Sequence, residues 1–134
     1  MFRRFLIFVR MKKHLLILFF LSITYTMSAQ IGEVKVDGAY AKIYDENGRY
    51  TNRVVHLGST KTLAGYNSQY IVIVDRTYAK IYDATGKDLN KSILLGDNKY
   101  IKHVSGSAIL VKDGNYVKYY DFDGRYTYKS TLDR

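Results

Sequence analysis

A six-residue pattern of tyrosine, lysine and aspartate occurs three times, and these side chains are of types that bind ligands. The copies span 40–45, 78–83 and 116–121, so they are 38 residues apart both times. Because side chains alternate along a strand, the first, third and fifth residues of each copy share one face. We therefore expect three equivalent faces, carrying Tyr40, Lys42 and Tyr44; Tyr78, Lys80 and Tyr82; and Tyr116, Lys118 and Tyr120.

These Tyr-Lys-Tyr faces have two interpretations. In the first, the tyrosine rings stack on sugars and their hydroxyls bond to sugar hydroxyls, while the lysines attract anionic groups. Repetition would then give multivalent contact with a polymer such as a polysaccharide or a cell-wall component. In the second, the rings fill the space between adjacent sheets and the lysines reach past them to solvent. Packing is the plainer interpretation, because a repeat protein recreates its packing residues in every copy.

An Asp-x-x-Gly motif closes each copy. Aspartate at the first position and glycine at the fourth suit a type I turn in which the glycine is left-handed. A calcium site would need six to eight oxygen ligands, and only the last copy has two aspartates close to the glycine. We therefore expect structural turns and no metal at these residues, which are Asp45, Gly48, Asp83, Gly86, Asp121 and Gly124.

The sequence predicts neither an enzyme nor a cofactor. It has no cysteine, which excludes disulfides, thiol nucleophiles and cysteine-ligated metals. After residue 30 the only histidines are His56 and His103, and neither recurs at the 38-residue period. The chain contains no nucleophile elbow, phosphate-binding loop or paired-histidine motif.

The first 29 residues have the composition of a secretory signal peptide. They carry five basic and no acidic residues, then an apolar run at 15–23, then Ser28 and Ala29. The run is shorter than the roughly 20 residues of a spanning helix, so we expect cleavage after Ala29 and no membrane contact afterwards. Translation could start at Met1 or at Met11. The mature protein would be exported, and either periplasmic or extracellular.

Removing this leader also changes the charge of the protein. Of the 21 basic residues, 16 remain, against all 12 acidic ones. Most of the apparent basicity therefore belongs to the signal, and nucleic acid is not an expected partner.

The remaining chain, 30–134, is predicted to be one all-β domain of repeats at 33–70, 71–108 and 109–134. Comparison of the first two repeats gives 14 identities in 38 positions. Each unit predicts a meander of four strands: an apolar strand, the Tyr-Lys-Tyr strand, a third strand ending near Leu57 or Leu95, and a weaker fourth strand near 61–66 or 99–104. The third unit ends before a fourth strand.

The unit at 71–96 resembles a blade of the NHL-type β-propellers. The shared features are an apolar strand ending in aspartate, a second strand ending in an aromatic residue and aspartate, and a Gly-Lys turn. These features concern architecture and imply no activity. A propeller typically has four to eight blades, more than this chain provides.

Three arrangements remain open for the repeats. Two chains could pair into a closed ring as a homodimer, one chain could form an open stack with capped ends, or the three units could close as a β-trefoil. Because 71–74 are apolar on both faces, we expect blade-like stacking. For function, we expect a binding module for a glycan-like polymer. The alternative is a protein-interaction or self-assembling module that pairs through exposed edge strands.

Overall fold

The computed structural model describes residues 30–133, which form eleven β-strands and no helix. The predicted signal peptide at 1–29 lies outside the described residues. Within 30–133 the chain forms no helix with the length and apolar character needed to cross a membrane.

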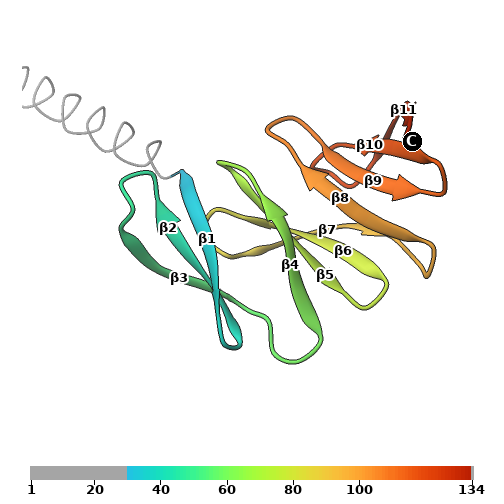
Figure 1. Ribbon diagram of the computed structural model, residues 1–134. Helices are drawn as coiled ribbons and strands as arrows, with labels where there is room; N and C mark the ends of the chain where they lie inside the picture. Colours follow the sequence, from blue (N-terminus) through green and yellow to red (C-terminus); the bar gives the residue numbers. More distant parts are fainter. Residues whose placement is uncertain (1–29, 134) are drawn as a thin grey trace, which may run out of the picture.

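The strands form three antiparallel sheets that lie in a row (Figure 1). Sheet 1 has the order β1-β2-β3, sheet 2 the order β4-β5-β6-β7, and sheet 3 the order β11-β10-β9-β8. Sheet 1 consists of β1 (Ile31–Asp37), β2 (Tyr40–Asp45) and β3 (Tyr50–His56). Sheet 2 consists of β4 (Lys61–Tyr66), β5 (Tyr70–Asp75), β6 (Tyr78–Asp83) and β7 (Asp88–Leu94). Sheet 3 consists of β8 (Lys99–Val104), β9 (Ile109–Asp113), β10 (Tyr116–Tyr120) and β11 (Tyr126–Leu132).

The all-β, blade-like repeat architecture is confirmed, and the β-trefoil alternative is wrong. A trefoil needs its strands to close into one barrel, whereas these three sheets are open and separate. The strands predicted at 61–66 and 99–104 are also present, as β4 and β8.

The assignment of those two strands to a sheet was wrong. β4 pairs with β5, and β8 pairs with β9, so each begins the next sheet instead of ending the previous one. The connection from Tyr66 to Tyr70 is a tight hairpin, closed by a bond from the Asn67 amide to the Tyr70 carbonyl. Consequently sheet 3 has all four strands, and sheet 1 is the one with three.

Two apolar cores lie between the three sheets. The first joins sheet 1 to one face of sheet 2 and includes Ile43, Ile71 and Tyr82. The second joins the other face of sheet 2 to sheet 3 and includes Ile81 and Ile109. The apolar faces of β5 explain this double burial, since Ile71, Val72 and Ile73 are all inaccessible to solvent.

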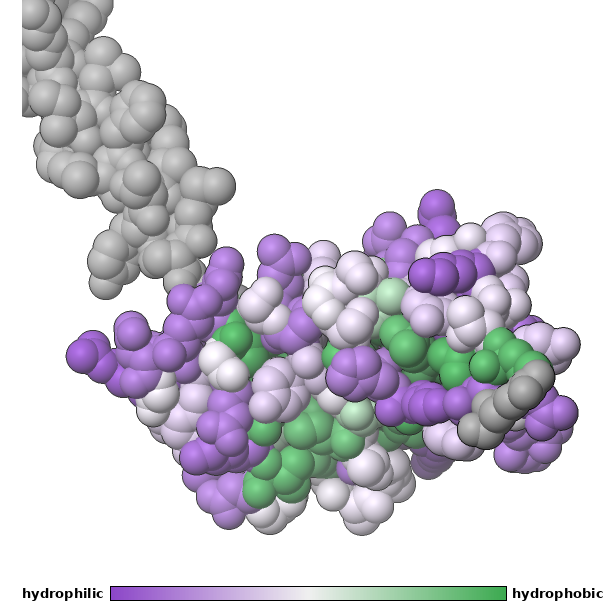
Figure 2. All heavy atoms as spheres, turned by 45° about the horizontal axis from the view of Figure 1, so that its top comes forward, coloured by the Kyte–Doolittle hydropathy of each residue, from purple (hydrophilic) through white to green (hydrophobic). Residues whose placement is uncertain are grey.

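The two ends of the row are polar. On the outer face of sheet 1, Glu33 and Lys35 occupy the positions held by Ile71 and Ile73 in sheet 2. Both side chains are exposed, and they form an ion pair of 3.7 Å. Figure 2 shows hydrophilic atoms gathered at this end, with hydrophobic atoms visible further along the row.

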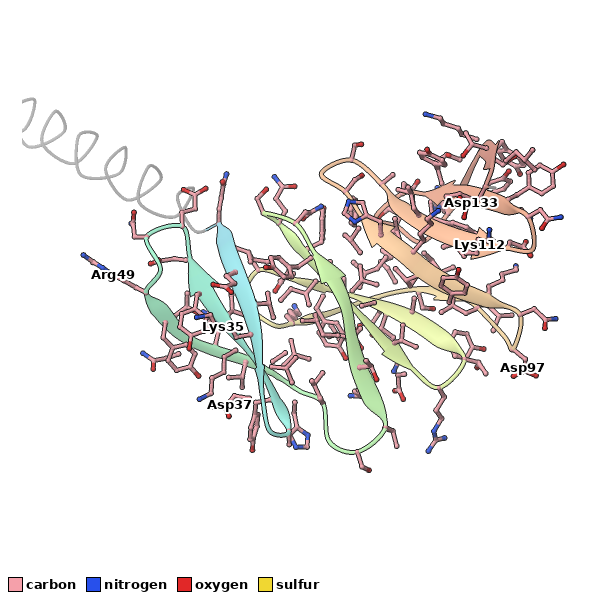
Figure 3. All side chains as sticks on the ribbon, viewed as in Figure 1. Lys35, Asp37, Arg49, Asp97, Lys112 and Asp133 are labelled. Atoms are coloured by element: carbon pink, nitrogen blue, oxygen red, sulfur yellow. The ribbon has the colours of Figure 1, made fainter. Side chains whose placement is uncertain are left out.

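The outer face of sheet 3 carries a charged cluster. Asp133 stands where the other sheets have the buried Leu57 and Leu95. Its Oδ2 lies 2.6 Å from Lys102 Nζ and 2.8 Å from Lys112 Nζ, and Figure 3 shows Lys112 and Asp133 side by side. The hydrogen bonds from the two lysines hold the pKa of Asp133 below its usual value. Polar end units of this kind keep a stack of repeats soluble.

Candidate functional site

The three Tyr-Lys-Tyr faces lie in equivalent places on β2, β6 and β10, but their environments differ. Each face is turned toward the preceding sheet, except in sheet 1, which has no preceding sheet among the described residues. Tyr82 is therefore buried in the first core, with only 5% of its surface exposed. Tyr120 is half-buried in the second core, and Tyr44 is half-buried beneath Lys35 and Tyr50. Of these three, Tyr82 cannot contact a ligand on the surface of this structure.

The first tyrosine of each face is exposed. Tyr40, Tyr78 and Tyr116 expose 45%, 45% and 51% of their surface. They lie at the start of their strands, next to the two-residue turns that follow Asp37, Asp75 and Asp113, where the covering sheet no longer reaches them. The structure therefore separates the predicted faces into exposed tyrosines at one end and packed tyrosines at the other.

A large exposed side chain lies opposite each of these tyrosines on the neighbouring strand. The pairs are Tyr40 with His56, Tyr78 with Leu94, and Tyr116 with Leu132. Cross-strand partners share a face, so each sheet presents one two-residue surface at the same end. We call these six residues the tyrosine row. The partners were missed in the sequence, although His56, Leu94 and Leu132 are themselves 38 residues apart.

The three predicted lysines are held by aspartates. Lys42 Nζ lies 2.7 Å from Asp37, Lys80 Nζ 3.4 Å from Asp75, and Lys118 Nζ 2.7 Å from Asp113. The sequence analysis had noted the period of these aspartates without pairing them with the lysines. The same ion pair thus recurs in every sheet.

Hydrogen bonding between the partners shifts their proton affinities. The bond from Lys42 lowers the pKa of Asp37, and the bond to Asp37 raises the pKa of Lys42. The same change occurs for Asp113 and Lys118. Each lysine is therefore charged at neutral pH but already neutralised locally, which weakens its attraction for an anionic ligand.

The three Asp-x-x-Gly segments form the turns that the sequence predicts. In the first turn, Asp45 Oδ1 accepts bonds from the amides of Asn47 and Arg49, both at 2.9 Å. The same acceptor role falls to Asp83 and Asp121, and all three glycines have positive φ. Burial alone would raise the pKa of Asp83, but hydrogen bonds from Thr85 and Lys87 outweigh it and leave the pKa lowered. One oxygen of each carboxylate is thus engaged by the turn itself.

Side chains with metal-binding or catalytic chemistry do not gather among residues 30–133. No group of three or more His, Cys, Asp or Glu side chains in this range is placed to hold a metal ion. His56 packs its ring against Tyr40 at 5.1 Å, and His103 is exposed on β8. The described residues therefore show a repeated contact surface and no reactive cluster.

Comparison with models of protein families, with curated proteins and with solved structures found no match to this chain. The resemblance to NHL-type blades accordingly stays a prediction from the sequence.

Proposed function

We propose that this chain is an exported, non-catalytic binding module whose tyrosine row contacts a glycan-like polymer. One observation carries the proposal: all three sheets present an exposed tyrosine and a large cross-strand neighbour at the same end. A half-exposed tyrosine offers an apolar ring together with a hydroxyl, which suits a ligand with both apolar and hydroxyl groups. Three equivalent contacts would add up along a polymer whose own units repeat.

The ion pairs favour a neutral polymer over an acidic one. Lys42, Lys80 and Lys118 were expected to attract anionic groups, but each already contacts an aspartate. Binding through the tyrosine row should then depend little on salt, because few charges are released or screened on contact.

The test is sedimentation of the mature protein with insoluble cellulose, chitin and peptidoglycan at low and high salt. The variant Tyr40→Ala/Tyr78→Ala/Tyr116→Ala should lose binding, and each single substitution should weaken it severalfold. Because these side chains are about half exposed, the variant should stay folded, which circular dichroism checks. A control variant, Tyr50→Ala/Tyr100→Ala, removes two exposed tyrosines outside the row and should bind normally. Failure of the wild-type protein to sediment with any of these polymers would refute the proposal.

The three-stranded sheet favours a second candidate function, which is interaction with another chain. By the repeat, β1 corresponds to β5 and β9, each of which pairs on both sides. Among residues 30–133, β1 pairs only with β2. An unpaired strand edge can accept an extended segment of another chain by backbone hydrogen bonding.

Sedimentation velocity tests self-association through this edge. If β1 pairs with β1 of a second copy, the mature protein should form dimers, and Lys35→Pro should abolish them by removing a backbone donor from the strand. Lys99→Pro at the first residue of β8 is a control that leaves β1 unchanged. A mature protein that remains monomeric up to millimolar concentration would contradict self-assembly through β1.

A further inference from the structure

Tyr128 is an exposed aromatic residue in a backbone conformation that tyrosine rarely adopts. Its φ is 65°, in the left-handed region, and 87% of its surface is exposed. Bulky residues are outliers in this region, whereas asparagine is several-fold enriched there. Tyr128 therefore carries backbone strain, and with so little of its surface covered it gains little packing in return.

The repeat shows which residue this position favours structurally. One and two periods earlier stand Asn90 and Asn52, with φ of 58° and 61°. All three residues lie in the same irregularity, where the outer strand of the sheet has extra residues opposite its neighbour. The backbone is thus common to the three sheets, and tyrosine in the third is the exception. Persistent strain at an exposed position points to a role in function.

Tyr128 extends a line of aromatic rings. The ring centroids of Tyr120 and Tyr126 are 5.5 Å apart, and those of Tyr126 and Tyr128 are 5.1 Å apart. The line runs from half-buried Tyr120, through half-buried Tyr126, to exposed Tyr128. In sheet 1 the same line stops at its second ring, with Tyr44 and Tyr50 at 5.5 Å, because the third position is Asn52. In sheet 2 it has only one ring, since Asp88 and Asn90 follow Tyr82.

The two outer rings form an open angle at the surface. The planes of Tyr126 and Tyr128 are inclined by 47°, and Lys118 Nζ lies 5.6 Å from the centre of the Tyr126 ring. This lysine is paired with Asp113, so the angle between the rings is apolar and bordered by hydroxyls rather than by an unpaired charge. A ring with apolar C–H faces and peripheral hydroxyls, as in a neutral hexopyranose, matches such a surface.

We propose that Tyr126 and Tyr128 form a sugar-binding platform on β11, a second contact point for the polymer that the tyrosine row binds. This inference deepens the proposed function and rests on it. Both surfaces involve β10 and β11, where Tyr116 and Leu132 lie at one end of the strand pair and Tyr120 and Tyr126 at the other. Four residues of strand separate Tyr116 from Tyr120, about 13 Å, so one extended chain of sugars could contact both.

The test compares Tyr128→Asn with Tyr128→Phe in the mature protein. Tyr128→Asn restores the residue of the other two sheets, so it should raise Tm by about 4 °C while lowering affinity for the polymer at least fivefold. Tyr128→Phe keeps both the ring and the strain, and it should retain most of the affinity. Tyr100→Asn, which changes an exposed tyrosine elsewhere, should leave the affinity unchanged. Soluble cellohexaose and chitohexaose serve as probes, with oligothymidine as the alternative stacking ligand, and binding is followed by NMR shifts of the tyrosine rings.

The outcomes separate this inference from the proposed function. Affinity lost in both Tyr128→Asn and the tyrosine-row variant, with Tyr128 ring shifts on adding hexasaccharide, supports the platform. Affinity lost only in the tyrosine-row variant overturns the platform and leaves the proposed function standing. Ring shifts with oligothymidine alone overturn the sugar assignment. Absence of binding to any glycan by the wild-type protein overturns both.

Discussion

Single residues hold these sheets together by different means even where the repeat makes them equivalent. Gly48, Gly86 and Gly124 occupy the same turn position, with φ of 76°, 84° and 81°. A Cβ atom on Gly86 would lie 2.7 Å from the Val54 carbonyl oxygen, and one on Gly124 would lie 2.5 Å from that of Ser92. A Cβ on Gly48 would have no atom within 4 Å. Each inner turn thus rests on the preceding sheet, whereas the first turn is free.

Alanine at these three glycines should therefore differ in cost. Gly48→Ala meets only the left-handed conformation and should cost about 1 kcal/mol of the free energy of unfolding. Gly86→Ala and Gly124→Ala should cost about 2–4 kcal/mol, because the neighbouring backbone must also move. Urea denaturation of the three variants measures the difference. Equal losses at all three positions would show that the contacts between turn and sheet contribute nothing.

At the scale of strands and turns, the sequence determines most of what the structure shows. Hydrophobic pattern and turn dipeptides locate β2, β6 and β10, and the Asp-x-x-Gly segments form the expected turns. A repeat fixes the period of its strands but not the point at which one sheet ends. Here that point depends on the tight hairpin at 67–69, which joins β4 to β5. The sequence analysis placed the boundary on the other side of β4.

The binding surface was only partly predictable, for a related reason. Alternation along a strand places Tyr78 and Tyr82 on one face, and the structure confirms the shared face. Which tyrosine is exposed depends on how far the preceding sheet extends, and that is a property of the packing of two sheets. Tyr82 lies beneath sheet 1, whereas Tyr78 lies beyond its edge and pairs with the exposed Leu94. The strain at Tyr128 is likewise visible only in the backbone.

For the whole molecule, the polar ends determine whether the row of sheets stops or continues. Sheet 1 replaces two core isoleucines with Glu33 and Lys35, and sheet 3 replaces core positions with Lys112 and Asp133. Charged side chains on an end face oppose stacking of another sheet, because stacking would remove them from water. The same residues oppose closure of two chains into a ring through these faces.

Restoring the repeat residues at both ends should turn this protein into a self-associating one. The variant Glu33→Ile/Lys35→Ile/Lys112→Val/Asp133→Leu presents apolar faces at both ends, like those buried in sheet 2, and should form assemblies that grow with concentration. Either pair of substitutions alone leaves one polar end, so growth should stop at a dimer. The control Arg49→Ile/Asp97→Leu changes one charge of each sign at exposed turns, labelled in Figure 3, and should stay as the wild type. Sedimentation velocity distinguishes these states. If the four-substitution variant sediments as the wild type at every concentration, the charged end faces are not what limits the length of the row.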